Sequence, residues 1–139
     1  MSSQKPEIRR GRHVVYNLHV HLVFVTKYRR KVFTKEILDD MQSIFERVCF
    51  EFDSTLVEFD GEEDHVHLLV HYPPKVSISK LVNSLKGVSS RKLRQKQYAN
   101  ITKNLWGDAL WSPSYFAGSC GGAPIEIIRQ YIEQQNTPQ

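Results

Sequence analysis

The stretch HVVYNLHVHLVFVT, residues 13–26, decides the fold, because apolar and polar side chains alternate along it. Alternation with a period of two is typical of a β-strand that packs on one side. The apolar face comprises Val14, Tyr16, Leu18, Val20, Leu22 and Phe24. The opposite face comprises His13, Val15, Asn17, His19, His21 and Val23. The stretch therefore predicts a strand with one face on a core and histidines on the other.

The segment after this strand is predicted to be a helix followed by a hairpin. Thr34 suits an N-cap, and we expect a helix from there to about residue 52. Its core face would be formed by residues spaced three and four apart, namely Ile37, Met41, Ile44, Phe45 and Val48. Two further strands, residues 55–59 and 64–72, flank a turn, and their short separation predicts a hairpin.

The rest of the chain completes the order of elements. A second helix is expected over residues 77–97 with Ser77 as its N-cap, followed by a loop over 98–109 and a fourth strand within 110–119. A last helix is expected over residues 123–136, and Pro124 suits its first turn. The order βαββαβ of the first six elements predicts an α+β, ferredoxin-like antiparallel sheet. Its helices would cover one face, the other face would stay available, and the last helix would be an addition.

Length and composition indicate one ordinary globular domain. The 139 residues fit a single domain spanning 1–139, in which residues 1–12 form a flexible basic arm. A net charge of +4 suits a nucleic-acid partner without proving one. Cys49 and Cys120 form no C-x-x-C pair, so a zinc site built on paired thiolates is not expected. The absence of a signal-like or membrane-spanning apolar run favours a cytoplasmic protein without a membrane partner.

Two histidine pairs stand on strands that the predicted fold makes neighbours. His65 and His67 are two apart, so both imidazoles point to one face of their strand. His19 and His21 repeat this spacing on the first strand. Two imidazoles on one rigid strand can hold a divalent ion, although two ordinary surface histidines have the same spacing. Spacing alone does not decide which pair would bind a metal.

Tyr131 and Gln135 are four apart on the last predicted helix and therefore share one of its faces. An adjacent apolar stripe comprises Ile125, Ile128 and Ile132. That stripe would dock the helix and leave the tyrosine and the glutamine at its edge. Taken alone, Tyr131 fits a boundary tyrosine with a buried ring and a hydrated hydroxyl.

Basic residues cluster after the first strand and along the second long helix. Candidate DNA-binding residues are Lys27, Arg29, Arg30, Lys86, Arg91, Lys92 and Arg94. Tyr28 lies within the first cluster, as in surfaces that track phosphates and stack bases. A solvated helix face would show the same charges.

Five segments in this order together resemble the single-tyrosine transposases with a His-hydrophobic-His (HUH) motif that belong to insertion sequences of the IS200 type. The segments are Lys27-Tyr28-Arg29-Arg30-Lys31, His65-Val66-His67 followed by Leu-Leu-Val, Leu85-Lys86-Gly87, Leu110-Trp111-Ser112-Pro113-Ser114-Tyr115-Phe116 and Tyr131-Ile132-Glu133-Gln134-Gln135. The resemblance covers about residues 11–136, which is nearly the whole chain.

The resemblance implies a set of roles for particular residues. Tyr131 would be the catalytic nucleophile, and His65, His67 and Gln135 would be the metal ligands. The ion would be Mg²⁺ or Mn²⁺, which suits mixed imidazole and amide ligands. The resemblance also implies a homodimer in which the last helix packs against the partner, so that the active sites are shared between subunits.

The activity implied by the resemblance is that of a metal-dependent DNA transposase. Such an enzyme cleaves and rejoins single-stranded DNA with hairpin ends through a 5′-phosphotyrosine intermediate on Tyr131. Two alternatives fit the residues. One is a non-catalytic RNA- or single-stranded-DNA-binding module of ferredoxin-like fold, and the other is a metal-dependent nuclease that uses water.

Overall fold

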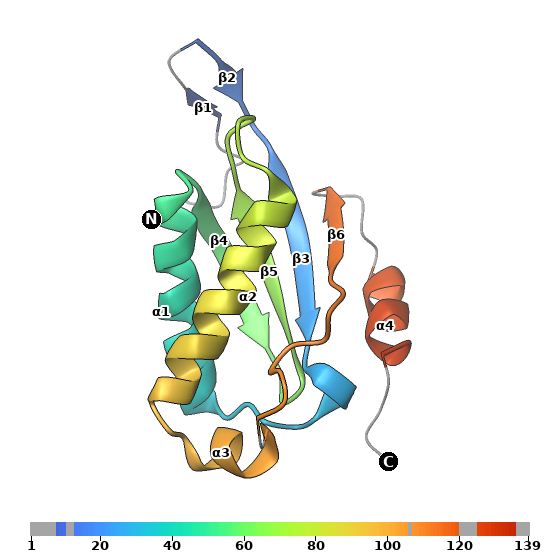
Figure 1. The fold of residues 1–139 in the computed structure, drawn as a ribbon. Helices are drawn as coiled ribbons and strands as arrows, with labels where there is room; N and C mark the ends of the chain where they lie inside the picture. The colour runs from blue at the N-terminus through green and yellow to red at the C-terminus, as the bar shows by residue number, and fades with distance from the viewer. Residues whose placement is uncertain (1–7, 11–12, 106, 120–124, 136–139) are drawn as a thin grey trace.

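A computed structural model describes residues 8–10, 13–105, 107–119 and 125–135 of the chain. Its main sheet has four antiparallel strands in the order β4-β5-β3-β6. In chain order these strands are β3 (His19–Val25), β4 (Thr55–Gly61), β5 (His65–His71) and β6 (Phe116–Ser119). Helices α1 (Lys35–Glu51) and α2 (Ile78–Gln95) lie together over one face of the sheet (Figure 1). This arrangement confirms the predicted ferredoxin-like α+β fold.

Both long helices begin at the hydroxyl N-caps that the sequence predicts. The Thr34 hydroxyl accepts a hydrogen bond from the Ile37 amide at 3.2 Å, and the Ser77 hydroxyl accepts one from the Lys80 amide at 3.3 Å. Each bond satisfies a backbone donor that has no partner inside the first helical turn. The two caps thereby fix where the helices start relative to the sheet.

The core lies between this helical layer and the sheet. The alternation in β3 sends Val20, Leu22 and Phe24 into it, and β5 contributes Val66, Leu68 and Val70 in the same way. The Phe24 ring meets Phe45 and Trp111 edge-on, with ring centroids 6.0 and 5.7 Å apart. Because successive strand residues point to opposite faces, the histidines of both strands are directed away from the helices.

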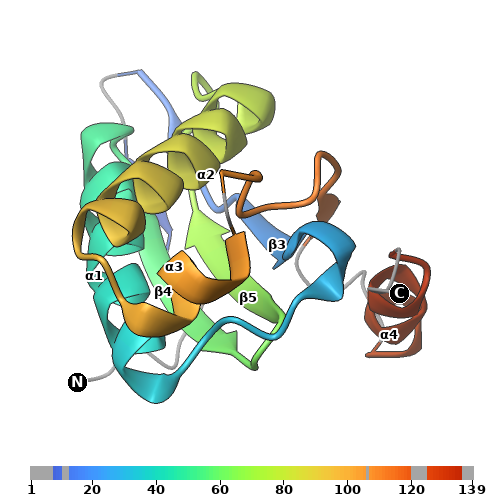
Figure 2. The same ribbon diagram turned by 60° about the horizontal axis from the view of Figure 1, so that its bottom comes forward.

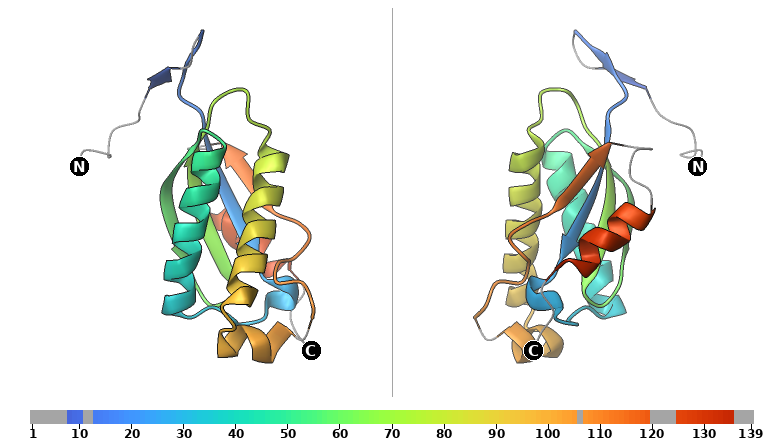
Figure 3. Two further views of the ribbon diagram at one scale, coloured as in Figure 1. Left: turned by 60° about the vertical axis from the view of Figure 1, so that its left-hand side comes forward. Right: turned by 90° about the vertical axis from the view of Figure 1, so that its right-hand side faces the viewer.

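The observed strand β3 is shorter than the strand predicted over residues 13–26. Residues 15–16 form a separate strand, β2 (Val15–Tyr16), which pairs with β1 (Arg9–Arg10) in a two-stranded ribbon beyond the sheet (Figure 3). Val14 is 39% exposed and Leu18 36%, because neither lies under the helices. Within the expected basic arm, Arg9–Arg10 thus forms a strand, while residues 1–7 and 11–12 lie outside the described residues.

The prediction of a loop over residues 98–109 is wrong, because helix α3 (Ala99–Leu105) forms there. Ile101 and Leu105 are four apart on this short helix, and both are buried against the main core. Two anchored side chains on one face stabilise a seven-residue helix that sequence propensity alone does not predict.

The last helix, α4 (Ile125–Glu133), lies on the face of the sheet opposite α1 and α2 (Figures 2 and 3). Ile128 is buried there in a small cluster with Val23 and Val25 of β3. Phe116, Tyr131 and Ile132 pack against the same cluster. The face expected to stay available is therefore covered by α4 over β3 and β6. Among the described residues, no helix is both long and apolar enough to cross a membrane.

Candidate functional site

The histidines of β3 and β5 lie on the sheet face that carries α4. The strands are antiparallel neighbours, and their register pairs His65 with Val25 and His67 with Val23. The ring centroids of His65 and His67 are 5.0 Å apart, and those of His21 and His67 are 5.8 Å apart. Three imidazoles therefore gather beside the cluster that holds α4.

His19, the other histidine of the first strand, belongs to a different group. It pairs with His71 at the opposite end of the strands, and their ring centroids are 4.4 Å apart. Tyr16 stacks on His71 at 5.4 Å. The expectation that His19 and His21 share one face with His65 and His67 is confirmed, and the register brings only His21 close to the pair at 65 and 67.

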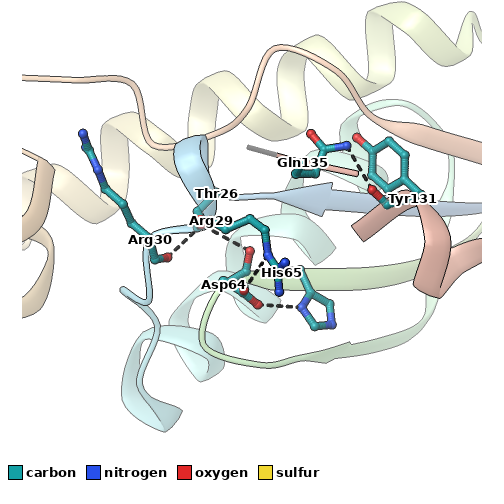
Figure 4. Close-up of polar contacts among 7 residues, drawn as sticks. All are labelled: Thr26, Arg29, Arg30, Asp64, His65, Tyr131 and Gln135. Atoms are coloured by element: carbon teal, nitrogen blue, oxygen red, sulfur yellow. Dashed lines mark hydrogen bonds and ion pairs between the residues drawn. The ribbon is translucent and has the colours of Figure 1, made fainter. Parts of the chain in front are cut away.

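The His65 side chain is held by its neighbour in the chain. The Nδ1 atom of His65 lies 2.8 Å from a carboxylate oxygen of Asp64, and both residues are 8% exposed. The other carboxylate oxygen accepts a hydrogen bond from Nε of Arg29 at 3.3 Å. Figure 4 shows this chain of contacts from the turn after β3 to the first residue of β5.

Burial lowers the pKa values of two of the three imidazoles, those of His67 and His21. Desolvation lowers the pKa of His67 below its ordinary value of 6.5, and the charges of His65 and His21 lower it further. Desolvation also lowers the pKa of His21, against a raising effect of Glu58. Both imidazoles are thus favoured in the neutral form, which is the form that binds metal ions.

These lowered pKa values predict that acid destabilises the protein. As the pH falls below 6.5, His21 and His67 take up protons in the unfolded chain before they do so in the folded one. The stability that they contribute is present above that pH and is lost as the pH falls through their folded pKa values. Urea unfolding at pH 7 and pH 5 should therefore show a smaller loss of unfolding free energy in His21→Gln/His67→Gln than in the parent chain. Equal losses in both proteins would contradict the expectation.

Tyr131 lies on α4, and Gln135 lies two residues beyond its last residue, Glu133. The Gln135 side-chain amide donates to the backbone oxygen of Tyr131 at 3.1 Å, and both residues contact the segment before β6. The Tyr131 hydroxyl lies 2.8 Å from the Ser114 hydroxyl. The amide oxygen of Gln135 accepts hydrogen bonds from Ser112 at 3.1 Å and from Ser114 at 3.4 Å. Burial raises the pKa of the Tyr131 phenol above 10.0, and the bond to Ser114 opposes that rise. The phenol is therefore protonated at neutral pH and must lose its proton before it can act as a nucleophile.

The tyrosine group and the histidine group are neighbours without a direct hydrogen bond. Val23 and Val25, which pack against Tyr131 and its helix, are the cross-strand partners of His67 and His65. Side chains directly opposite on adjacent strands lie about 5 Å apart at their β-carbons. Figure 4 shows Tyr131 and Gln135 side by side and His65 apart from both. Among the described residues, no hydrogen bond links Tyr131 or Gln135 to either histidine.

The donor set fits a divalent ion in its chemistry. His65 has Nδ1 against a carboxylate, which leaves Nε2 as the nitrogen available to a metal, and His67 lies beside it. Within the described residues, His, Cys, Asp and Glu side chains nowhere gather in a metal-binding group of three. The amide oxygen of Gln135 is a donor of the type that Mg²⁺ and Mn²⁺ accept.

The predicted DNA-binding residues fall into four places. Lys27, Arg30 and Arg94 converge on Asp108, whose pKa is lowered by the hydrogen bond and the charge of Arg30. Arg29 contacts Asp64 as described. The ammonium of Lys86 donates to the backbone oxygens of Ser112 and Ser114 at 2.8 and 2.7 Å, and burial lowers its pKa to about 8. Arg91 and Lys92 line a hollow of about 490 Å³ between α1 and α2, together with Arg47 and Glu51.

Sequence reasoning missed three residues that hold the site. Asp64 was not among the candidate site residues, yet it is buried against His65. Ser112 and Ser114 showed no catalytic pattern, yet they bind Gln135 and Tyr131. For Asp64 the available signal was its place directly before the histidine pair. For the serines the available signal was their place in the segment of residues 110–116 that resembles the family, whereas their partners are 23 and 17 residues away.

The chain thus combines a ferredoxin-like sheet with a histidine pair and a tyrosine-bearing helix on one sheet face. The chain belongs to the family of IS200-like transposases, whose model matches residues 14–135. It is 33% identical over 130 residues to the ISDra2 transposase TnpA of Deinococcus radiodurans, which covers 94% of this chain and 92% of that protein. It is 31% identical over 123 residues to the transposase of insertion sequence IS200 from Salmonella typhimurium, covering 88% and 80% of the two chains.

Solved structures agree with this membership. A crystal structure from Deinococcus radiodurans, assigned as a transposase, matches with a TM-score of 0.84 at 33% identity and covers 94% of this chain and 99% of that one. A REP-associated tyrosine transposase bound to a REP hairpin matches with a TM-score of 0.57 at 10% identity, covering 90% and 68%. The second likeness concerns the fold alone. The transposase class expected from the sequence is confirmed.

Proposed function

We propose that this protein cleaves and rejoins single-stranded DNA at the ends of an insertion sequence, with Tyr131 as the nucleophile. One observation carries the proposal. The helix that bears Tyr131 packs on Val23 and Val25, the cross-strand neighbours of His67 and His65. The proposed nucleophile and the proposed metal-binding imidazoles thus share one sheet face, which supports phosphoryl transfer at a single site.

In the proposed reaction the Tyr131 oxygen attacks a DNA phosphorus in line with the leaving 3′-oxygen. A tyrosine O–P bond forms, the P–O3′ bond breaks, and the phenol proton is released while the strand leaves with a 3′-OH. A 3′-OH from another DNA end then attacks the 5′-phosphotyrosine and releases the tyrosine. Each step exchanges one phosphodiester for another, so the reaction needs no nucleotide cofactor.

His65, His67 and Gln135 are the residues that we propose to hold a divalent ion, Mg²⁺ or Mn²⁺. When bound, the ion would supply Lewis-acid polarisation of the phosphate oxygens. The Gln135 amide oxygen accepts bonds from Ser112 and Ser114 in the present arrangement. We expect those bonds to break when the amide turns to a metal ligand.

The partners are proposals of the same kind. We expect a homodimer with active sites shared between subunits, acting in the cytoplasm on DNA with hairpin ends. The hairpin bound by the REP-associated relative supports the choice of DNA. Of the basic residues, Arg91 and Lys92 are exposed and remain the best placed for phosphate contacts. We further propose that residues 1–139 act as one domain and that residues 123–136 are its catalytic segment, of which Ile125–Glu133 forms α4 and residues 123, 124 and 136 lie outside the described residues.

The experiment is a denaturing gel of the wild-type protein incubated with Mn²⁺ and 3′-labelled single-stranded DNA from the element's ends. We expect a labelled covalent protein–DNA adduct that disappears with EDTA and in His67→Ala. The complementary strand is the control and should not be cut. Cleavage without an adduct would indicate a nuclease that uses water, and binding without cleavage would indicate a non-catalytic module. Either result would overturn the proposal.

A further inference from the structure

We propose that Asp64, itself held by Arg29, is a positioning residue that fixes the tautomer and orientation of His65, with Nδ1 protonated and Nε2 presented to the ion. The metal-binding part of this inference rests on the proposed function. The tautomer part concerns the metal-free protein and stands independently of it.

The contacts around Asp64 define which nitrogen carries the proton. One carboxylate oxygen receives the Arg29 Nε–H at 3.3 Å, so the carboxylate is paired with a permanent cation. The other oxygen lies 2.8 Å from Nδ1 of His65. An ionised carboxylate only accepts hydrogen bonds, so Nδ1 must be the donor. The lone pair of the neutral imidazole is then on Nε2, which is the usual arrangement of a metal-ligating histidine.

The backbone around this contact is held on both sides. Thr26 is fully buried, and its amide donates to the backbone oxygen of Asp64 at 2.9 Å. Its hydroxyl, which has a single hydrogen, lies 2.7 Å from the backbone oxygen of Arg30 and 3.2 Å from that of Asp64. The end of β3 is thereby fastened to the residue before the histidine pair. Asp64 is thus held by its backbone oxygen as well as by its side chain.

The turn that carries Arg29 has an unfavourable backbone conformation, and the contact between Arg29 and Asp64 helps to hold it. Tyr28 and Arg29 have φ angles of +61° and +54°, a left-handed conformation that side chains other than glycine rarely adopt. Two such residues in succession are disfavoured unless surrounding contacts compensate. The surrounding structure must over-determine the turn, and the ion pair from Arg29 to Asp64 is one of the contacts that does so (Figure 4).

His67 differs from His65 in this respect. Among the described residues, its side chain makes no hydrogen bond, and Asp60 and Glu62 act on it only through space. The two imidazoles of the pair are therefore held differently, one by a hydrogen bond and one by packing. Arg29, predicted from the sequence as a DNA contact, has its guanidinium turned to Asp64 instead.

The test is ¹⁵N NMR of the histidine rings in the full, metal-free chain. In the wild type we expect the His65 signals of an Nδ1–H tautomer, and in Asp64→Ala a shift toward the Nε2–H tautomer. Glu62→Ala is the matched control, since it removes a nearby acid without touching a hydrogen bond, and it should leave the tautomer unchanged. A wild-type His65 with its proton on Nε2 would overturn the inference even if Asp64→Ala does not fold.

Metal affinity provides the second readout. Titration of Mn²⁺ followed by EPR should show a dissociation constant that is roughly 10- to 100-fold larger in Asp64→Ala than in the wild type. The increase in Arg29→Gln should be smaller. Unchanged Mn²⁺ affinity in a folded Asp64→Ala protein would contradict the positioning role. A wild type that has the expected tautomer but binds no Mn²⁺ would instead count against the proposed metal ligands.

Discussion

Replacing Tyr131 with phenylalanine is expected to abolish the covalent adduct and to lower DNA strand cleavage by on the order of 10³-fold or more. The substitution removes only the phenolic oxygen, which is the atom proposed to bond to phosphorus. The ring contacts remain, including the one to Phe116 at a centroid distance of 6.0 Å, so α4 should stay docked. The measurement is the yield of labelled adduct on a denaturing gel in the presence of Mn²⁺.

Two control variants separate the nucleophile from its surroundings. Tyr72→Phe removes a phenolic oxygen at the far end of β5, where Tyr72 packs against the main core, and should leave adduct formation unchanged. Ser114→Ala removes the hydrogen-bond partner of Tyr131 and leaves the nucleophile in place, so an adduct should still form. The only hydrogen bond that Tyr131→Phe removes among the described residues is the one to Ser114, whose side chain is exposed and can bond to water instead. This substitution should therefore change the unfolding free energy by less than about 0.5 kcal/mol. An adduct that persists in Tyr131→Phe would rule this tyrosine out.

Mixing two inactive variants should restore activity if the active sites are shared between subunits. Tyr131→Phe keeps the histidine pair, and His67→Ala keeps the tyrosine, so each protein alone is inactive in the proposed chemistry. In a mixed dimer, one of the two composite sites would contain an intact tyrosine and intact histidines. Random exchange of subunits should therefore return about a quarter of the wild-type adduct yield.

The structure also suggests the alternative in which each active site lies within one chain. In the single chain described, α4 packs on its own sheet beside its own histidine pair. If that arrangement is the catalytic one, every chain in the mixture carries one defect and no activity returns. The necessary control is a tagged mixture purified through one variant, which shows that mixed dimers have formed. Absence of rescue in confirmed mixed dimers would place each active site within one chain.

Much of the fold followed from local patterns, because those patterns report on burial directly. The alternation at residues 19–25 and 65–71 predicted two strands with histidines on one face. Thr34 and Ser77 marked the starts of the two long helices, since a hydroxyl cap acts on amides two or three residues away. Where the sequence was misleading, tertiary packing decided. The alternation continued through Val14 and Leu18 beyond the end of the sheet, and Ile101 and Leu105 anchored a helix in a polar region.

The sequence by itself determined which residue types are the candidates for the chemistry: two imidazoles two positions apart, and a tyrosine and an amide four positions apart. Only the tertiary structure decided that His21 rather than His19 lies beside this pair, because strand register is set by pairing across the sheet. It also decided that Asp64 is a buried partner of His65 and that Ser112 and Ser114 contact Gln135 and Tyr131. Such contacts join residues that are distant in the chain or depend on which side of a turn is buried. No periodicity of two or 3.6 residues encodes them.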